Sequence, residues 1–151
     1  MEITKSVADE MIYLFTERFG EERSKRYLDL IKDQENQLLI VAEVDSKVIG
    51  SLNIRRFSPD SNKSDHVGSL GMLVVNGYRE MGVGSALMDY AMNWANETPG
   101  IEKILLGVFS GNERAIRLYE KFGFEVEGVE KKQFKIRGRY VDEILMAKFI
   151  K

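Results

Sequence analysis

Three residues have the types and spacing of an anion site, in the pattern Arg79-x-x-Gly82-x-Gly84. The residues after this pattern predict an amphipathic helix, and the first N–H groups of a helix lack intrahelical partners. The helix dipole also places positive charge there. Because glycine has no side chain, a turn that contains it lets an anion approach these N–H groups closely. The predicted ligand is a diphosphate, with Arg79 either contacting it or bracing the turn.

Two common phosphate-binding motifs do not match this stretch. A Walker A loop ends in Gly-Lys-Ser/Thr, whereas Ser85 directly follows Gly84 in this chain. A dinucleotide fingerprint needs a further Gly or Ala where this chain has Leu87. The plain alternative is a tight strand-to-helix connection that happens to contain two glycines. The pattern by itself leaves both interpretations open.

Candidates for proton transfer are few. Tyr119 lies on the face of a predicted helix and is either a general acid or a core aromatic residue. His66 is the single histidine, but its place beside a polar loop favours a surface role. Asp142 and Glu143 either attract a cationic substrate or are ordinary surface charges. The general base therefore stays open, and a chain of water molecules is an alternative.

The composition excludes several kinds of chemistry. The 151 residues include no cysteine, which excludes thiolate metal sites, disulfides and a cysteine nucleophile. The 22 Lys and Arg residues nearly balance the 24 Asp and Glu residues, so the net charge is −2. With this charge balance, we expect no nucleic acid as a partner. No apolar stretch approaches the roughly 20 residues that cross a membrane, so we expect no membrane partner. We also expect no metal. Without a signal peptide, the expected location is the cytoplasm.

The N-terminal part is predicted to be largely helical. Met1–Lys5 is a poor strand by composition. Ser6–Phe19 and Glu21–Gln34 predict two helices, the first capped by Ser6. An alternative places Tyr13–Phe15 in an irregular loop.

The middle of the chain predicts antiparallel strands. Leu38–Val44 and Lys47–Phe57 form a hairpin across the turn Asp45-Ser46. A polar loop, Ser58–Asp65, leads to a strand over Val67–Val75. Two glycines within this strand, Gly68 and Gly71, indicate a bulge or the close approach of a backbone or ligand.

The C-terminal part alternates helices and strands. The strongest helix signal of the chain is the apolar stripe of Gly82–Glu97. Asn112 is expected to cap a helix that ends at Lys121, with Gly123 just beyond its end. Strands are predicted over Ile104–Phe109, Phe124–Gly128 and Glu143–Phe149, and the basic segment Lys131–Arg139 as a solvated strand or hairpin. The predicted fold class is mixed α+β, with residues 1–151 as one domain.

Two blocks of sequence resemble the GNAT family of N-acetyltransferases. The first is Arg79-x-x-Gly82-x-Gly84, similar to the family's coenzyme A signature R/Q-x-x-G-x-G/A. The second runs from Asn112 to Phe124 and resembles N-x-x-A-x-x-L-Y-x-x-x-G-F. A helix and one strand separate the blocks, as they do in the family. The resemblance covers roughly residues 38–151.

The resemblance implies a fold and a coenzyme site. The fold is a twisted mixed sheet, flanked by helices, that splays between its fourth and fifth strands. The coenzyme is acetyl-CoA, and the implied binding residues are Leu73, Val74, Val75, Arg79, Glu80, Met81, Gly82, Val83, Gly84, Ser85, Asn112 and Tyr119. The start of the chain departs from the family pattern, which predicts a shortened N-terminal unit.

The implied reaction transfers an acetyl group directly to a primary amine, on a small molecule or a protein N-terminus. A backbone N–H near Val74 or Val75, with Val75 the chosen donor, would stabilise the acetyl carbonyl oxygen. Tyr119 would act as the general acid toward the sulfur. The alternatives are an inactive acyl-CoA-binding sensor or structural subunit, and a nucleotide-binding module. Exposed strand edges also allow a homodimer.

Overall fold

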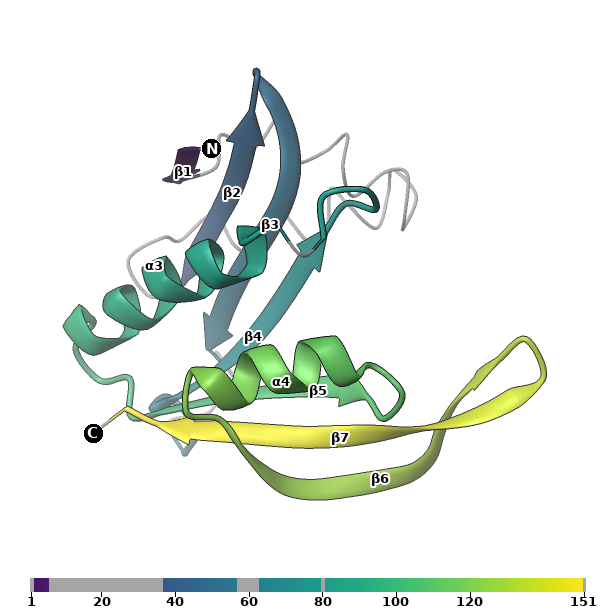
Figure 1. The fold of residues 1–151 in the computed structure, drawn as a ribbon. Helices are drawn as coiled ribbons and strands as arrows, with labels where there is room; N and C mark the ends of the chain where they lie inside the picture. Colours follow the sequence, from purple (N-terminus) through teal and green to yellow (C-terminus); the bar gives the residue numbers. More distant parts are fainter. Residues whose placement is uncertain (1, 6–36, 57–62, 80, 151) are drawn as a thin grey trace, which may run out of the picture.

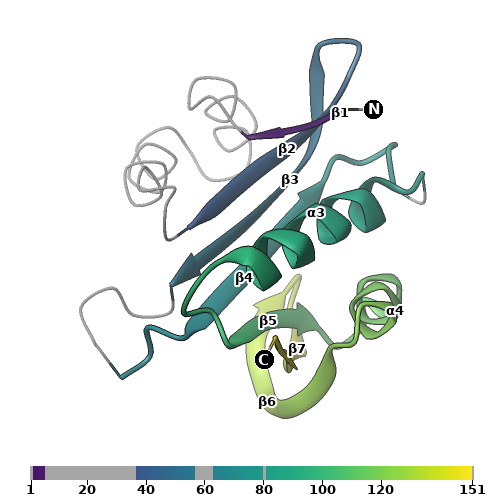
Figure 2. The same cartoon turned by 90° about the vertical axis from the view of Figure 1, so that its left-hand side faces the viewer.

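The computed structural model describes residues 2–5, 37–56, 63–79 and 81–150. Within them a seven-stranded mixed sheet has the order β1-β2-β3-β4-β5-β7-β6. Its strands are β1 (Glu2–Lys5), β2 (Leu38–Val44), β3 (Lys47–Arg56), β4 (Val67–Val74), β5 (Lys103–Phe109), β6 (Glu125–Ile136) and β7 (Arg139–Phe149). The described helices, α3 (Val83–Glu97) and α4 (Glu113–Lys121), lie on the same face of this sheet (Figures 1 and 2). None of the helices in these ranges is long and apolar enough to cross a membrane.

The first four strands form an antiparallel unit, as expected for the hairpin and the strand after it. Asp45 and Ser46 both have positive φ, which is the type I′ geometry that suits two-residue hairpins. The expectation that Met1–Lys5 makes a poor strand was wrong, because Glu2–Lys5 pairs with β2. Backbone pairing with a buried neighbour overrides weak strand propensity. The two helices predicted within residues 6–36 lie outside the described residues.

The sheet opens between β4 and β5. These parallel strands pair only from Val67 opposite Lys103 to Ser69 opposite Leu105, although both strands continue further. Figure 1 shows β2, β3 and β4 running steeply, whereas β5, β7 and β6 run across the view. The predicted splay between the fourth and fifth strands is confirmed.

The core lies between the sheet and α3. Leu87, Met88 and Ala91 are fully buried along one side of that helix and contact buried side chains of β2 and β3. Trp94 is half-buried and packs against the same cluster, as the apolar stripe predicted. The helix ends at Glu97, before Pro99.

Helix α4 ends at a glycine, as predicted. Gly123 has φ +90, and its N–H donates to the Glu120 carbonyl while the Phe124 N–H donates to Tyr119. These bonds form the Schellman motif that ends a helix at a glycine.

The strand after α4 is longer than predicted. This strand, β6, continues to Ile136 rather than stopping at Gly128, and pairs with β7. Polar composition hides this strand in the sequence, because most of its side chains are exposed.

Candidate active site

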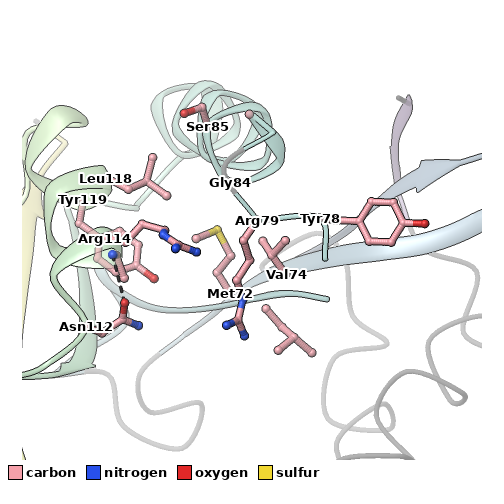
Figure 3. Close-up of a pocket in the computed structure, with 13 residues that line it drawn as sticks. Met72, Val74, Tyr78, Arg79, Gly84, Ser85, Asn112, Arg114, Leu118 and Tyr119 are labelled. Carbon is pink, nitrogen blue, oxygen red and sulfur yellow. Dashed lines mark hydrogen bonds between the residues drawn. The ribbon is translucent and has the colours of Figure 1, made fainter. Parts of the chain in front are cut away.

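A pocket of about 330 Å³ lies where α3, α4 and the open end of β4 meet. Figure 3 shows the Tyr119 hydroxyl and the Arg114 side chain extending from α4 into the space beside Met72 of β4. The lining residues are Met72, Leu73, Val74, Tyr78, Arg79, Gly82, Gly84, Ser85, Asn112, Arg114, Ala115, Leu118 and Tyr119. The splay in the sheet therefore leads into a pocket that two helices border.

The N-terminus of α3, which borders this pocket, has N–H groups without intrahelical partners. Gly82 is the N-cap residue with φ +80, and no side chain caps the helix. The first intrahelical bond runs from the Ala86 N–H to the Gly82 carbonyl over 3.0 Å. The N–H groups of Val83, Gly84 and Ser85 precede that bond and have no intrahelical acceptor. A Cβ added at Gly82 would meet no atom within 4 Å, so the approach is open.

The second glycine of the motif has a different role. A Cβ at Gly84 would lie 2.9 Å from Leu118 Cδ2 and 3.6 Å from Met72 Cε. Gly84 therefore lets the first turn of α3 approach α4 and β4 closely. Each glycine therefore fits one of the two interpretations. Gly82 leaves space for an anion, as in an anion site, whereas Gly84 allows close packing, as in a tight strand-to-helix connection.

The expectation that the Val75 N–H is available to donate to an acetyl carbonyl oxygen was wrong. The Val75 N–H donates to the Ile49 carbonyl over 2.8 Å, so it is already used in the pairing of β3 with β4. Backbone groups alternate between the two edges of a strand. The Val74 N–H therefore points away from β3, toward the gap where β5 has diverged. Val74 lines the pocket and Val75 does not.

Asn112 is the N-cap of α4, as predicted. Its Oδ1 accepts a hydrogen bond from the Ala115 N–H over 3.3 Å (Figure 3). The Nδ2 group of the same amide is a donor that the cap does not use. The side chain is exposed at the pocket rim. The residue can therefore hold the helix and contact a ligand at once.

Tyr119 lies at the inner end of the pocket and is only 7% exposed. Its ring packs at 6.0 Å from the Phe124 ring, centroid to centroid. Burial raises the pKa of Tyr119 to about 12, because the phenolate form is poorly solvated there. The hydroxyl is thus protonated at neutral pH and able to donate.

Charge in the pocket favours an anion. Arg79 and Arg114 are its charged side chains among the described lining residues, and none of those residues is acidic. Arg114 was missed in the sequence, as were four other lining residues. Those four are Met72, Tyr78, Ala115 and Leu118. Ala115 and Leu118 are motif residues whose fixed spacing from Asn112 was a usable signal.

Besides Val75, two more of the predicted coenzyme residues do not line the pocket, and one cannot be placed. Glu80 falls outside the described residues. Met81 is 66% exposed and does not line the pocket. The side chain of Val83 is buried in the core, so only its backbone could contact a ligand. His66 is exposed just before β4, in keeping with a surface role.

Known proteins are similar to this chain in sequence. The L-amino acid N-acetyltransferase AaaT of Escherichia coli K12 is 36% identical over 109 residues, which are 72% of this chain and 66% of that protein. The spermidine N(1)-acetyltransferase of the same strain is 28% identical over 94% of this chain and 75% of that protein. The match spans 58% to 66% of the length of the first curated relatives.

A solved structure shows the same fold. The protein yncA of Salmonella typhimurium, described with its cofactor acetyl-CoA, has a TM-score of 0.85 and is 15% identical. The alignment covers 99% of this chain and 94% of that one. The model of the acetyltransferase (GNAT) family matches residues 8–124, which is most of the chain. The resemblance and the predicted fold are thereby confirmed, and the chain belongs to the GNAT family of acetyltransferases.

Proposed function

We propose that this chain is an N-acetyltransferase that uses acetyl-CoA and transfers the acetyl group directly to a primary amine. The observation that carries the proposal is the convergence of the open N-terminus of α3, the Val74 N–H and the Tyr119 hydroxyl on one pocket. A structural relative described with acetyl-CoA and relatives named as N-acetyltransferases support it.

We assign successive parts of the coenzyme to groups along the pocket. The N–H groups of Val83, Gly84 and Ser85 would hold the pyrophosphate, with Arg79 adding charge. Asn112 Nδ2 would donate to the pantetheine arm. Bound acetyl-CoA supplies an acetyl group activated as a thioester.

Two residues would act on the reacting atoms. The Val74 N–H would donate to the acetyl carbonyl oxygen, a kind of contact worth about 2.7–4 kcal/mol in the transition state. Tyr119 would donate to the sulfur as the carbon–sulfur bond breaks. A thiol ordinarily has a pKa near 8.5, so complete proton transfer from Tyr119 would be uphill by roughly 5 kcal/mol. We therefore propose that its main contribution is a hydrogen bond to the developing thiolate.

An acceptor panel tests the proposal. Purified protein is mixed with acetyl-CoA and one of three probe amines: spermidine, L-phenylalanine, or a hexapeptide with a free N-terminal alanine. We expect release of free thiol together with the acetylated amine for at least one of them. Calorimetry with acetyl-CoA alone and with ATP or NAD runs in parallel. Binding of acetyl-CoA without turnover of any probe would favour the sensor, and tighter binding of ATP or NAD would favour a nucleotide-binding module.

A further inference from the structure

Two glycines face each other across the gap in the sheet. The parallel pairing of β4 with β5 ends at Ser69 opposite Leu105. Continuing the same register brings Gly71 opposite Gly107. Each lies between residues whose side chains point to the helices, so both glycines lie on the sheet face away from α3 and α4. We call this face the outer face, and the gap there has no side chain at either glycine.

A polar side chain from the next strand lies over each glycine. Asn53 of β3 is opposite Gly71, and its Oδ1 lies 2.9 Å from the place that a Gly71 Cβ would take. Glu143 of β7 leans over Gly107, and its Oε1 occupies the place of a Gly107 Cβ. Only glycine at position 107 lets the Glu143 carboxylate lie over β5. On the outer face, an amide oxygen therefore lies over β4 and a carboxylate lies over β5.

The surroundings of Glu143 favour its protonated form more than water does. Glu130 of β6 is directly opposite and hydrogen-bonds to it. Partial burial raises the pKa of Glu143, and the charge of Glu130 raises it further. From β5, Phe109 is directly opposite, and its ring lies 5.0 Å from that of Phe134. Further charged groups on the outer face of the described strands beside the gap are Arg55 of β3 and Lys103 of β5, and Lys103 Nζ lies 2.6 Å from Glu127 Oε1.

We propose that Glu143 is the general base of the reaction and that Asn53 Oδ1 orients the acceptor amine. This inference rests on the proposed function. The coenzyme would fill the helix side of the gap, so the amine must arrive from the outer face. There the Glu143 carboxylate lies over Gly107 of β5, whereas His66 lies before the start of β4.

The step balances without a further reactant. Glu143 takes one proton from the acceptor ammonium, and Asn53 Oδ1 accepts a hydrogen bond from a remaining N–H. The freed nitrogen lone pair forms a bond to the acetyl carbon as the carbon–sulfur bond breaks. The second proton leaves the nitrogen for solvent, and the departing thiolate, which accepts a hydrogen bond from the Tyr119 hydroxyl, takes up a proton from solvent. Glu143 then releases its proton to solvent, leaving the amide, the free thiol and one proton.

Substitutions at three glutamates test this assignment with the probe amines of the panel. Glu143→Gln should lower kcat at pH 7.5 by about 100-fold or more, within the usual range for loss of a general base. Its Kd for acetyl-CoA should stay within twofold of the wild-type value. Glu130→Gln should keep turnover but shift the acid limb of kcat/KM to lower pH, because it removes the charge that raises the pKa of Glu143. Glu125→Gln, an exposed residue of β6, is the matched control and should change neither quantity.

The outcomes separate this inference from the proposed function. If wild type acetylates a probe and Glu143→Gln keeps both its rate and its acid limb, Glu143 is not the base while the proposed function stands. A Glu143→Gln protein with a lost acid limb, and a Glu143→Asp protein with partial recovery, would support the assignment. If wild type binds acetyl-CoA but acetylates no probe, the proposed function fails and the base assignment fails with it.

Discussion

Tyr119 shows how one residue can serve both packing and chemistry. Its ring belongs to the core cluster, while its hydroxyl group lines the pocket. Helix spacing alone could not separate a core aromatic from an acid, because a residue on the buried side of α4 satisfies both descriptions. The decisive feature is that the pocket reaches the hydroxyl end of the side chain (Figure 3).

We predict that Tyr119→Phe lowers kcat at least tenfold, because the sulfur loses its hydrogen-bond donor. The Kd for acetyl-CoA should change little, since the ring and its packing remain. Stopped-flow or steady-state thiol release measures kcat, and calorimetry measures Kd. An unchanged rate and pH–rate profile would remove Tyr119 from the mechanism.

The raised pKa of Tyr119 also predicts a pH effect on stability. The pKa of Tyr119 is about 12 in the folded state against an ordinary value of 10.0, so the folded state holds the proton more tightly. This contribution is fully present below pH 10 and is lost as pH rises toward 12. Wild type should therefore lose roughly 2–3 kcal/mol of unfolding free energy over that range relative to Tyr119→Phe. Urea denaturation at pH 9, 10 and 11 compares the two, and parallel curves would contradict the buried hydroxyl.

At the scale of elements, α3 and α4 differ in how their first backbone N–H groups are satisfied. α4 satisfies its first N–H groups with Asn112, whereas α3 leaves its own uncapped. A missing cap costs about 1 kcal/mol. An uncapped start beside a pocket with two arginines is therefore consistent with a site in which the ligand itself completes the cap.

Gly82→Glu should weaken acetyl-CoA binding at least tenfold, because a carboxylate would enter the proposed phosphate position. Gly138→Glu is the matched control, since Gly138 has φ +79 against +80 at Gly82 and both have open space around them. Gly138 lies at the tip of the β6–β7 hairpin, away from the pocket lining. Both variants should therefore carry the same backbone strain, and calorimetry should show a loss only for Gly82→Glu. Equal affinities would refute the phosphate cradle.

Two substitutions at Asn112 should separate its roles. Asn112→Ala removes the cap and should cost about 1 kcal/mol of unfolding free energy. Asn112→Ser keeps a capping oxygen and should stay within about 0.5 kcal/mol of wild type. Both lose the amide donor, so both should bind acetyl-CoA more weakly. Should Asn112→Ser bind as tightly as wild type, the amide would be a cap and nothing more.

At the scale of the whole molecule, the splay of the sheet is what makes one site out of distant segments. β4 and α3 belong to one half of the sheet, whereas α4 joins the other half through β5. The strands meet over only a short paired stretch, so the pocket lies between two halves that few backbone bonds connect. A ligand in the pocket would contact both halves.

Acetyl-CoA should therefore stabilise the fold measurably. At a free concentration of 100 times Kd, binding adds about 2.7 kcal/mol. For a chain of this size that predicts a rise in Tm of roughly 5–10 °C. Differential scanning fluorimetry with and without acetyl-CoA measures this rise. Gly138→Glu should show the same rise in Tm as wild type, whereas Gly82→Glu should lose most of it. A wild-type Tm that does not respond to acetyl-CoA would contradict the bridging site.

The sequence by itself determined most of the elements and the residues at the starts of α3 and α4, several of which line the pocket. Strong local signals, such as the stripe of α3, the Asn112 cap and the hairpin turn at Asp45-Ser46, depend on residues close in the chain. Such signals act through local hydrogen bonds and periodic burial, and for this reason they are legible without a structure. The exposed strand β6 beyond Gly128 carried no such signal.

Only the tertiary structure decided which backbone and side-chain groups are available. That the Val75 N–H is used by Ile49 and that Gly84 accommodates Leu118 are facts of pairing and packing between distant segments. The position of Glu143 over Gly107 depends equally on the register of β5 with β7. Register and close packing are set by the whole core together, so residue types and spacing along the chain could not determine them.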